Sequence, residues 1–419
     1  MEQKADLTTG RVRLWNTNYT LVWIANFMLY FSFMLLVPLF PLYLRDTFGA
    51  DKEMIGWVLS GYTIAALVVR PFSGWVVDSF PRKTVLLLCY FFVMLMFAGY
   101  LAAGSLTMFA LFRTLHGAPF GATTVASTTV AIDVLAPSRR AEGIGYFGLA
   151  NNFATAISPT IAIFLLHAFG NNYDLLFLLS LIVSFIGVVI VTRIRMPKKN
   201  HAASVNDSSD LQADGAKTPA QSIRVVSLDR FILLKAWREG LCMLCYSFSY
   251  GVIATYLAIY GEEELGIKGG TGLFFLLLAS GLALSRLTGA KGLRQGRVSH
   301  NAAEGVVVSL FGYFLFAALH NPFGFYGAAL IIGLGNGHMY PAFQNMFINL
   351  APNSQRGTAT STLLTSWDIG VGIGVLVGGV AAEQINYHAA FWIMWIVNLL
   401  GVSMFFLFAR KHYDRNKLR

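Results

Sequence analysis

The sequence predicts an all-α membrane protein in which twelve transmembrane helices form two pseudo-symmetric six-helix bundles. Three observations lead to this fold class: the composition, a series of long apolar stretches and an internal repeat. Hydrophobic residues make up 56% of the 419 residues and charged residues only 12%, whereas a soluble domain carries roughly 25% charged residues. Most of the chain is therefore expected to lie in lipid.

Apolar stretches of about 20 residues or more follow one another along almost the whole chain. Each is long enough to cross a hydrocarbon core of roughly 30 Å as a helix, and a helix pairs its own backbone groups, which lipid cannot do. The predicted spans are 18–43, 54–77, 84–104, 107–132, 142–168, 173–194, 233–260, 271–291, 303–320, 323–347, 358–383 and 388–409.

The second half of the chain repeats the first at an offset of about 216 residues. Repeated pairs are Arg70 and Arg286, Gly117 and Gly333, Gly121 and Gly337, and Tyr173 and Tyr387. A repeat of this length indicates a duplicated six-helix membrane bundle. Two similar halves around a central site can expose that site to each side of a membrane in turn, which points to transport.

A polar segment separates the two halves. Residues 195–227 open with basic residues and continue through Ser, Asn, Asp and Ala with almost no large apolar side chains, which is typical of a flexible tether. The expected organisation is an N-terminal bundle over 1–194, a cytoplasmic linker over 195–227 and a C-terminal bundle over 228–419.

The placement of the 31 basic residues predicts the orientation. The net charge of +10 could indicate nucleic-acid binding, but most of the Lys and Arg residues fall in the termini and in alternate loops, and those expected outside are Arg45, Lys52 and Lys268. This positive-inside bias predicts a multi-pass protein of the cell (inner) membrane with both termini cytoplasmic. Its surroundings are the lipid bilayer, and no nucleic-acid partner is expected.

The sequence offers no support for an enzymatic function. The chain has no Gly-Lys-Ser/Thr nucleotide-binding loop, so ATP drive is not indicated. Cys242 and Cys245 have zinc spacing but no second pair to complete a metal site. We expect a protein that is not an enzyme and holds neither a metal nor a cofactor.

The loop after the second predicted span carries a charged motif. It places an acid at the end of a helix, one turn after a small residue, with two cations beyond, and such an acid can bind the positive N-terminal end of a neighbouring helix. The loop resembles the signature Gly-x-x-x-Asp-Arg-x-Gly-Arg-Arg of the major facilitator superfamily, from which it departs at Ser79 and Pro81. The resemblance implies the major facilitator fold and a gating latch formed by Gly74, Asp78, Arg82 and Lys83.

The fourth predicted span contains a buried cation. Arg113 shares one helix face with Gly117, Gly121, Thr124 and Thr128, and an Arg at membrane depth is costly enough to require a cavity or a partner. The pattern is similar to the Arg-x-x-x-Gly of proton-coupled members of the superfamily. By that resemblance Arg113 interacts with the substrate or with the proton-carrying group. A purely structural Arg is the alternative.

Two further resemblances concern the direction of transport. The fifth span keeps Gly145 and Pro159 of the Gly-rich helix found in the exporter branch of the superfamily, and Arg70-Pro71 resembles bacterial drug or sugar efflux carriers. These similarities tilt the expectation toward export.

Proton coupling requires a titratable group at membrane depth. Acids in the interior of the spans are few, and Asp368 and Glu239 are the candidates. In the superfamily's usual arrangement the second helix packs near the eleventh, so Arg70 is the expected partner of Asp368 and Arg286 the second choice. Asp368 either alternates between ion pairing and protonation or forms a static ion pair. His338 is a further titratable side chain of the tenth span.

The central cavity, by the same resemblance, is lined by spans 1, 4, 7 and 10. The first span carries no acid, which lowers the expectation of strictly cationic substrates, and the aromatic and polar side chains suit amphipathic organic molecules or glycosides. The cavity candidates are Asn26, Tyr30, Thr124, Thr128, Tyr246, Tyr250, Asn336, His338, Tyr340, Gln344 and Asn345.

The sequence therefore predicts a secondary active transporter that exports small organic compounds such as drugs, sugars or metabolites in exchange for protons, by alternating access and as a monomer. Two alternatives remain open: an uptake symporter or uniporter for a sugar or metabolite, and a non-transporting membrane scaffold or sensor.

Overall fold

The computed structural model describes residues 13–37, 39–50, 52–170, 172–196, 228–267 and 271–418. Nearly all of the predicted linker 195–227 lies outside these ranges, and the side chain of Arg286 is also outside the described part. Within the described ranges the chain is helical, and twelve helices of 18 residues or more follow one another in two groups of six. The predicted all-α, twelve-helix fold class is confirmed.

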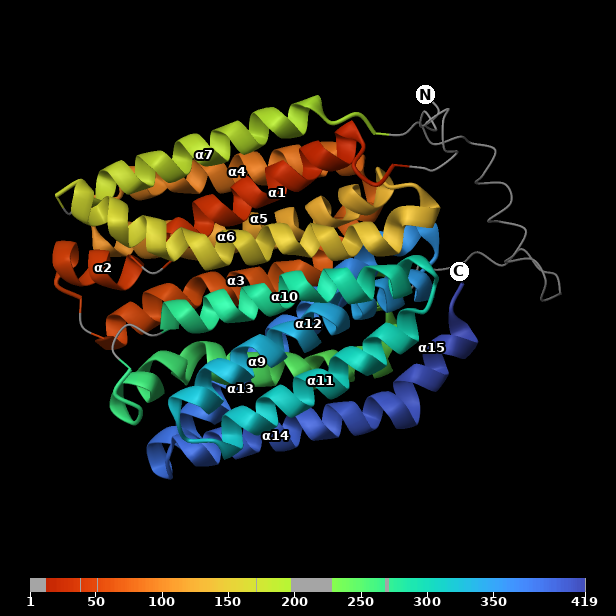
Figure 1. Ribbon diagram of the computed structural model, residues 1–419. Coiled ribbons are helices and arrows are strands. Elements are labelled where there is room, and N and C mark those ends of the chain that lie inside the picture. Colours follow the sequence, from red (N-terminus) through yellow and green to blue (C-terminus); the bar gives the residue numbers. More distant parts are fainter. Residues whose placement is uncertain are drawn as a thin grey trace.

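The helices α1–α7 form one half and α9–α15 the other, side by side along one direction (Figure 1). The long helices of the first half are α1 (Thr17–Leu36), α3 (Lys52–Ser79), α4 (Arg82–Ala102), α5 (Leu106–Asp133), α6 (Arg140–Ala168) and α7 (Tyr173–Arg193). Those of the second half are α9 (Trp237–Glu263), α10 (Thr271–Arg294), α11 (Val298–Ala318), α12 (Pro322–Leu350), α13 (Arg356–Gln384) and α14 (Tyr387–Met404).

Short elements complete the described chain. They are α2 (Phe40–Phe48), α15 (Arg410–Asn416), a π-helical turn (Phe405–Ala409), and the 3-10 turns η1 (Pro137–Arg139), η2 (Leu228–Arg230), η3 (Leu234–Ala236) and η4 (Asn353–Gln355). The start of α1 and the end of α15 lie at one end of the bundle, called here the termini end, and α2 lies at the other (Figure 1).

The first predicted span differs from the structure. Residues 18–43 were expected to form one helix, but α1 ends at Leu36 and α2 begins at Phe40. The sequence places Pro38 and Pro41 in this stretch, and proline removes a backbone donor and clashes with the preceding helical turn. The hydropathy pattern continues through the break because these residues are apolar, so it could not reveal the interruption.

Six of the described helical segments are long and apolar enough by themselves to cross a bilayer: α1, α4, α7, α11, and the stretches Asn353–Ala382 and Tyr387–Asn416. Other long helices carry charged groups such as Arg70, Arg113 and Glu239, which lower their hydropathy. These three residues are at most 8% exposed, so the structure turns them toward neighbouring helices and away from lipid.

The repeat seen in the sequence is visible in the packing. A Cβ added at Gly117 of α5 would collide with the backbone oxygen of Tyr62 in α3, and one added at Gly333 of α12 would collide with that of Leu278 in α10. Small residues at these positions let each helix pair approach closely. The two halves therefore use the same contact at equivalent places.

A second repeated contact lies at the α2 end. The Tyr173 hydroxyl, at the start of α7, donates to Asp46 Oδ2 at 2.8 Å, and the Tyr387 hydroxyl, at the start of α14, donates to Glu263 Oε2 at 2.9 Å. Hydrogen bonds from Arg45 and Tyr173 hold the pKa of Asp46 below its usual value. Each half thus ties the start of its last long helix to an acid near the end of its first long helix: Glu263 is the last residue of α9, and Asp46 lies in α2, which follows α1.

Candidate functional site

The motif after α3 joins the two halves at the termini end. Asp78 accepts hydrogen bonds from the backbone amides of Gly357 and Thr358, both at 2.8 Å, and from Thr358 Oγ1 at 3.0 Å. Gly357 and Thr358 form the first turn of α13, whose free amides and dipole favour a negative charge. Asp78 is therefore an inter-half cap of α13.

An ion-pair network surrounds this cap. Arg82 pairs with Asp78 at 3.1 Å and with Asp133 Oδ2 at 2.6 Å, and Arg356 of the other half pairs with Asp133 Oδ1 at 2.8 Å. Arg82 Nη2 also donates to the Asn353 carbonyl oxygen at 3.2 Å. We call Asp78, Arg82, Asp133 and Arg356 the latch.

Gly74 and Lys83, the other two residues of the predicted motif, make contacts of other kinds. Gly74 lies where a Cβ would meet Thr358 Cα at 2.8 Å and the Gly357 oxygen at 2.9 Å, so it permits α3 and α13 to touch. Lys83 donates to the Thr192 carbonyl oxygen at 2.8 Å, which places it on the end of α7 within its own half. Lys83 is thus no direct contact between the halves.

Sequence reasoning missed Asp133 and Arg356 as latch residues. The repeat contains a signal for Arg356, because Arg140 stands three residues after Pro137 and Arg356 four residues after Pro352, and each begins a long helix, α6 and α13. The structure uses the two copies differently, since Arg140 Nε donates to the Ile132 carbonyl oxygen within its own half.

Deeper between the halves, the structure brings Arg70 and Asp368 together. Arg70 Nε lies 2.5 Å from Asp368 Oδ2, and the two side chains are 10% and 21% exposed. Arg70 Nη1 also donates to Thr124 Oγ1 at 3.4 Å, and Ser361 Oγ donates to the Arg70 carbonyl oxygen. Arg70 belongs to α3 and Asp368 to α13, so this pair also spans the two halves.

Aromatic side chains lie near the Arg70–Asp368 pair. Tyr30 and Tyr340 lie close enough to interact electrostatically with both charges. Trp367, next to Asp368, packs against Tyr250 and Tyr340 with ring centroids 5.4 Å apart in each case. Tyr30, Tyr340, Trp367 and Tyr250 therefore form a partly polar aromatic wall drawn from both halves.

The other predicted cavity residues are distributed more widely. Asn26 accepts from Ser127 at 3.2 Å and donates to Asn151. Asn345 donates to the Ala141 carbonyl oxygen of the other half at 3.4 Å. Three of them contact side chains of the second half: Tyr246 packs against Phe343, Asn336 accepts a hydrogen bond from Ser309, and His338 is hydrogen-bonded to Thr288. Thr128 and Gln344 are buried.

Glu239 does not lie at the central pair. It is fully buried near the start of α9, where His412 Nδ1 of α15 lies 2.9 Å from its Oε1. Arg286, the second partner proposed for Asp368, has its side chain outside the described part of the chain.

Arg113 occupies an aromatic cage in the first half. Its guanidinium carbon lies 4.2 Å from the ring centroid of Tyr62, 4.6 Å from that of Phe40 and 5.2 Å from that of Phe33. Its Nε and Nη1 are buried without a hydrogen-bond partner, and no carboxylate of the described residues forms an ion pair with it.

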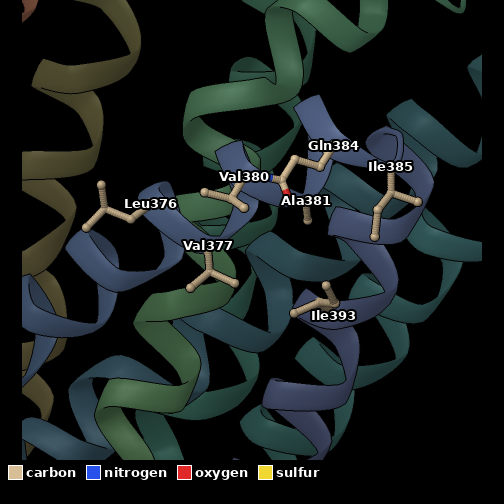
Figure 2. A pocket seen from close by; sticks show the side chains of 7 residues that line it. All are labelled: Leu376, Val377, Val380, Ala381, Gln384, Ile385 and Ile393. Carbon is tan, nitrogen blue, oxygen red and sulfur yellow. The ribbon is translucent and has the colours of Figure 1, made fainter.

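A hollow of about 370 Å³ opens near the C-terminal end of α13, away from the latch (Figure 2). It is lined by apolar side chains and Gln384 of α13, by Ile385 directly after that helix, and by Ile393 of α14. Leu376 and Val380 are 71% and 56% exposed there. By contrast Ser361 and Leu363, toward the termini end of α13, are buried, so α13 is covered mainly near the latch.

The chain is similar over most of its length to bacterial transport proteins. It is 22% identical to the staphylopine export protein of Staphylococcus aureus, over 86% of this chain and 88% of that protein. It is 26% identical to the uncharacterized MFS-type transporter YhhS of Escherichia coli, over 90% and 89%. It is 21% identical to the multi-drug resistance efflux pump PmrA of Streptococcus pneumoniae, over 90% and 92%.

Solved structures share the fold. The Major Facilitator Superfamily transporter FucP, crystallised in the outward conformation, aligns with a TM-score of 0.73 at 16% identity, over 96% of this chain and 99% of that one. The human organic anion transporter MFSD10 aligns with a TM-score of 0.72 at 16% identity, over 93% and 98%.

The sequence profile of the Major Facilitator Superfamily matches residues 22–304 and 301–419, which together cover nearly the whole chain. The paired six-helix halves and the inter-half latch agree with this match. The chain therefore belongs to the Major Facilitator Superfamily, as a multi-pass transporter of the cell membrane.

Proposed function

We propose that this protein exports small organic compounds in exchange for protons by alternating access, with Asp368 as the proton-carrying group. The observation that carries the proposal is the Arg70–Asp368 ion pair at 2.5 Å between α3 and α13. Any state that opens the termini end must separate these two helices, and with them the pair.

Protonation of Asp368 provides a reason for that separation. The charged pair attracts α3 and α13 to each other, and removing one charge of a buried pair costs about 3–5 kcal/mol in comparable proteins. A proton on Asp368 cancels the attraction and leaves Arg70 available to a polar group of the substrate. Proton binding and opening of the termini end are thereby linked through one carboxylate.

The surroundings of the pair support an amphipathic organic substrate. Tyr30, Tyr250 and Tyr340 supply aromatic faces with hydroxyl groups, and Trp367 supplies an indole ring. Small-molecule sites commonly combine aromatic walls with a few polar groups. The first span has Asn26 in place of an acid, so a cationic group on the substrate is not required.

Export and orientation are supported by other observations. Two of the bacterial relatives are an export protein and an efflux pump. The excess of basic residues in the termini and in the loops of the same side favours a cytoplasmic termini end. The latch then closes the cytoplasmic side, and the protein works as a monomer.

The test measures internal pH in proteoliposomes that hold an imposed pH gradient. A trapped pH dye reports proton movement while amphipathic drugs and sugars are added one at a time. We expect compound-triggered proton flux in the parent protein and in Glu304→Gln, which removes an exposed carboxylate paired with His300. Asp368→Asn should lose the flux yet keep binding of the same compound. Unchanged flux in Asp368→Asn would remove Asp368 from the mechanism.

Uptake of a sugar or metabolite is the second candidate. The hydrogen-bonded side chains Asn26, Ser127 and Asn151 offer the amide and hydroxyl groups that bind sugar hydroxyls. The same vesicles separate the two functions, because a symporter moves protons in the direction of the compound and an antiporter moves them against it. Counterflow of a labelled sugar without proton movement would favour a uniporter.

A further inference from the structure

The chain that leads into the second half crosses the latch. Phe231 packs against Phe72 and Trp75 of α3, with ring centroids 5.4 and 6.0 Å apart. The Arg230 carbonyl oxygen accepts a hydrogen bond from Thr358 Oγ1 of α13 at 3.2 Å, and the Leu233 amide donates to Thr362 Oγ1 at 2.9 Å. We call residues 228–236 the strap, because they contact α3 and α13 together.

A small cavity lies beneath the strap. It has a volume of about 180 Å³ and is lined by residues of the strap, α3 and the start of α13, among them Arg230, Trp75, Ser79 and Gln355. The Arg230 guanidinium carbon lies 4.9 Å from the ring centroid of Trp75, and no carboxylate of the described residues forms an ion pair with it. Trp75 Nε1 is buried without a hydrogen-bond acceptor.

The carboxylate that lines this cavity does not prevent an anionic ligand from binding. Asp78 also lines it, but its two oxygens already accept hydrogen bonds from two backbone amides, a hydroxyl and Arg82. Its charge is thus compensated, while the donors of Arg230 and Trp75 remain open to a ligand. Because its acid is compensated and its donors are open, the cavity favours a small anionic group such as a phosphate.

Exposed apolar side chains stand close in the sequence to the residues that line the cavity. Phe72, Phe80, Leu228 and Ile232 are 52%, 55%, 67% and 38% exposed. The 28 residues of α3 measure about 42 Å at roughly 1.5 Å per residue, which exceeds a hydrocarbon core of about 30 Å. The end of α3 that bears Asp78 is therefore at headgroup depth, where apolar rings meet acyl chains and cations meet phosphates.

We propose that the strap and the cavity beneath it bind an anionic phospholipid, with the phosphate at Arg230 and Trp75 Nε1 and the acyl chains against Phe72, Phe80, Leu228 and Ile232. A lipid bound there holds the strap across α3 and α13, and so stabilises the closed latch. Membrane composition thereby biases which side of the transporter is open. The proposal does not depend on the transported compound or on the coupling ion.

Native mass spectrometry of the full-length protein in detergent tests the site. Phosphatidylglycerol should bind more tightly than phosphatidylcholine. Arg230→Gln should weaken phosphatidylglycerol about fivefold, since one basic residue near an anionic surface has that order of effect. Trp75→Phe, which keeps the ring and removes the N–H, should weaken it as well. Arg415→Gln removes an exposed basic residue of α15 at the same end and should bind like the parent.

Hydrogen exchange in lipid nanodiscs tests the consequence. The amides of Leu233, Gly357 and Thr358 should exchange more slowly in phosphatidylglycerol than in phosphatidylcholine, and Arg230→Gln should abolish the difference. Equal binding of both lipids, or unchanged binding in both variants, would overturn the proposal. Displacement of the lipid by millimolar glycerol 3-phosphate would mean a site for a soluble phosphate, and would overturn it too.

Discussion

Asp133 and Arg356 form an ion pair at 2.8 Å between the end of α5 and the start of α13. The other oxygen of Asp133 pairs with Arg82 at 2.6 Å, so one carboxylate holds cations of both halves. All three side chains are 14% exposed or less, which limits screening by solvent. Asp133 is thus the centre of the latch, whereas Asp78 caps a helix.

Replacing Asp133 with Asn should open the termini end more often. The substitution leaves Arg82 and Arg356 close together without their shared counter-charge, so the closed latch loses stability. Labelling of a cysteine at Thr360, which is 1% exposed in α13, by a soluble maleimide in a background without native cysteines should become several-fold faster. Asp174→Asn, at the opposite end of the bundle, is the control. Equal labelling rates in the two variants would show that Asp133 does not hold the gate.

Alanine at Gly117 or Gly333 should destabilise the protein by similar amounts. Each added Cβ would collide with the backbone of the neighbouring helix, and overpacking of this kind costs about 1–3 kcal/mol. Gly148→Ala is the matched control, because its Cβ would meet nothing within 4 Å and alanine favours a helix. Thermal unfolding in detergent measures all three. A normal melting temperature in both Gly117→Ala and Gly333→Ala would contradict the close helix contacts.

Arg113→Met should separate the structural role of Arg113 from a role in transport. The cage of Phe33, Phe40 and Tyr62 accepts an apolar side chain, and replacing a buried charge that has no ion-pair partner removes its desolvation cost. We expect a melting temperature at or above that of the parent, together with loss of proton-linked transport. Arg113→Lys keeps the charge but not the planar stacking, and should melt earlier. Normal transport by Arg113→Met would mean that the side chain is structural only.

Hydropathy predicted helix positions well and left side-chain directions open. The span predicted at 173–194 corresponds to α7 at Tyr173–Arg193, because an apolar run in lipid has few alternatives to a helix. The sequence also named both members of the Arg70–Asp368 pair, through the expected neighbourhood of the second and eleventh helices.

The pattern could not show which neighbour a polar side chain faces. Asn336 and His338 are predicted cavity residues, and they bond to Ser309 and Thr288 in adjacent helices of the same half. Glu239, a candidate for proton coupling, contacts His412 of α15. These positions depend on helix rotation, and in a bundle where polar groups face both the cavity and other helices, periodicity alone does not fix that rotation.

His412→Ala should destabilise the second half by leaving the buried Glu239 carboxylate without its hydrogen-bond partner. His412 Nδ1 lies 2.9 Å from Glu239 Oε1, and Glu239 Oε2 has no partner. Loss of the contact should cost about 1–3 kcal/mol, read as a lower melting temperature. Glu239→Gln in the same chain should recover part of the loss, because the buried group is then neutral. His300→Ala, from an exposed pair at 3.8 Å, should change stability little. If His412→Ala melted like His300→Ala, α15 would not be anchored through Glu239.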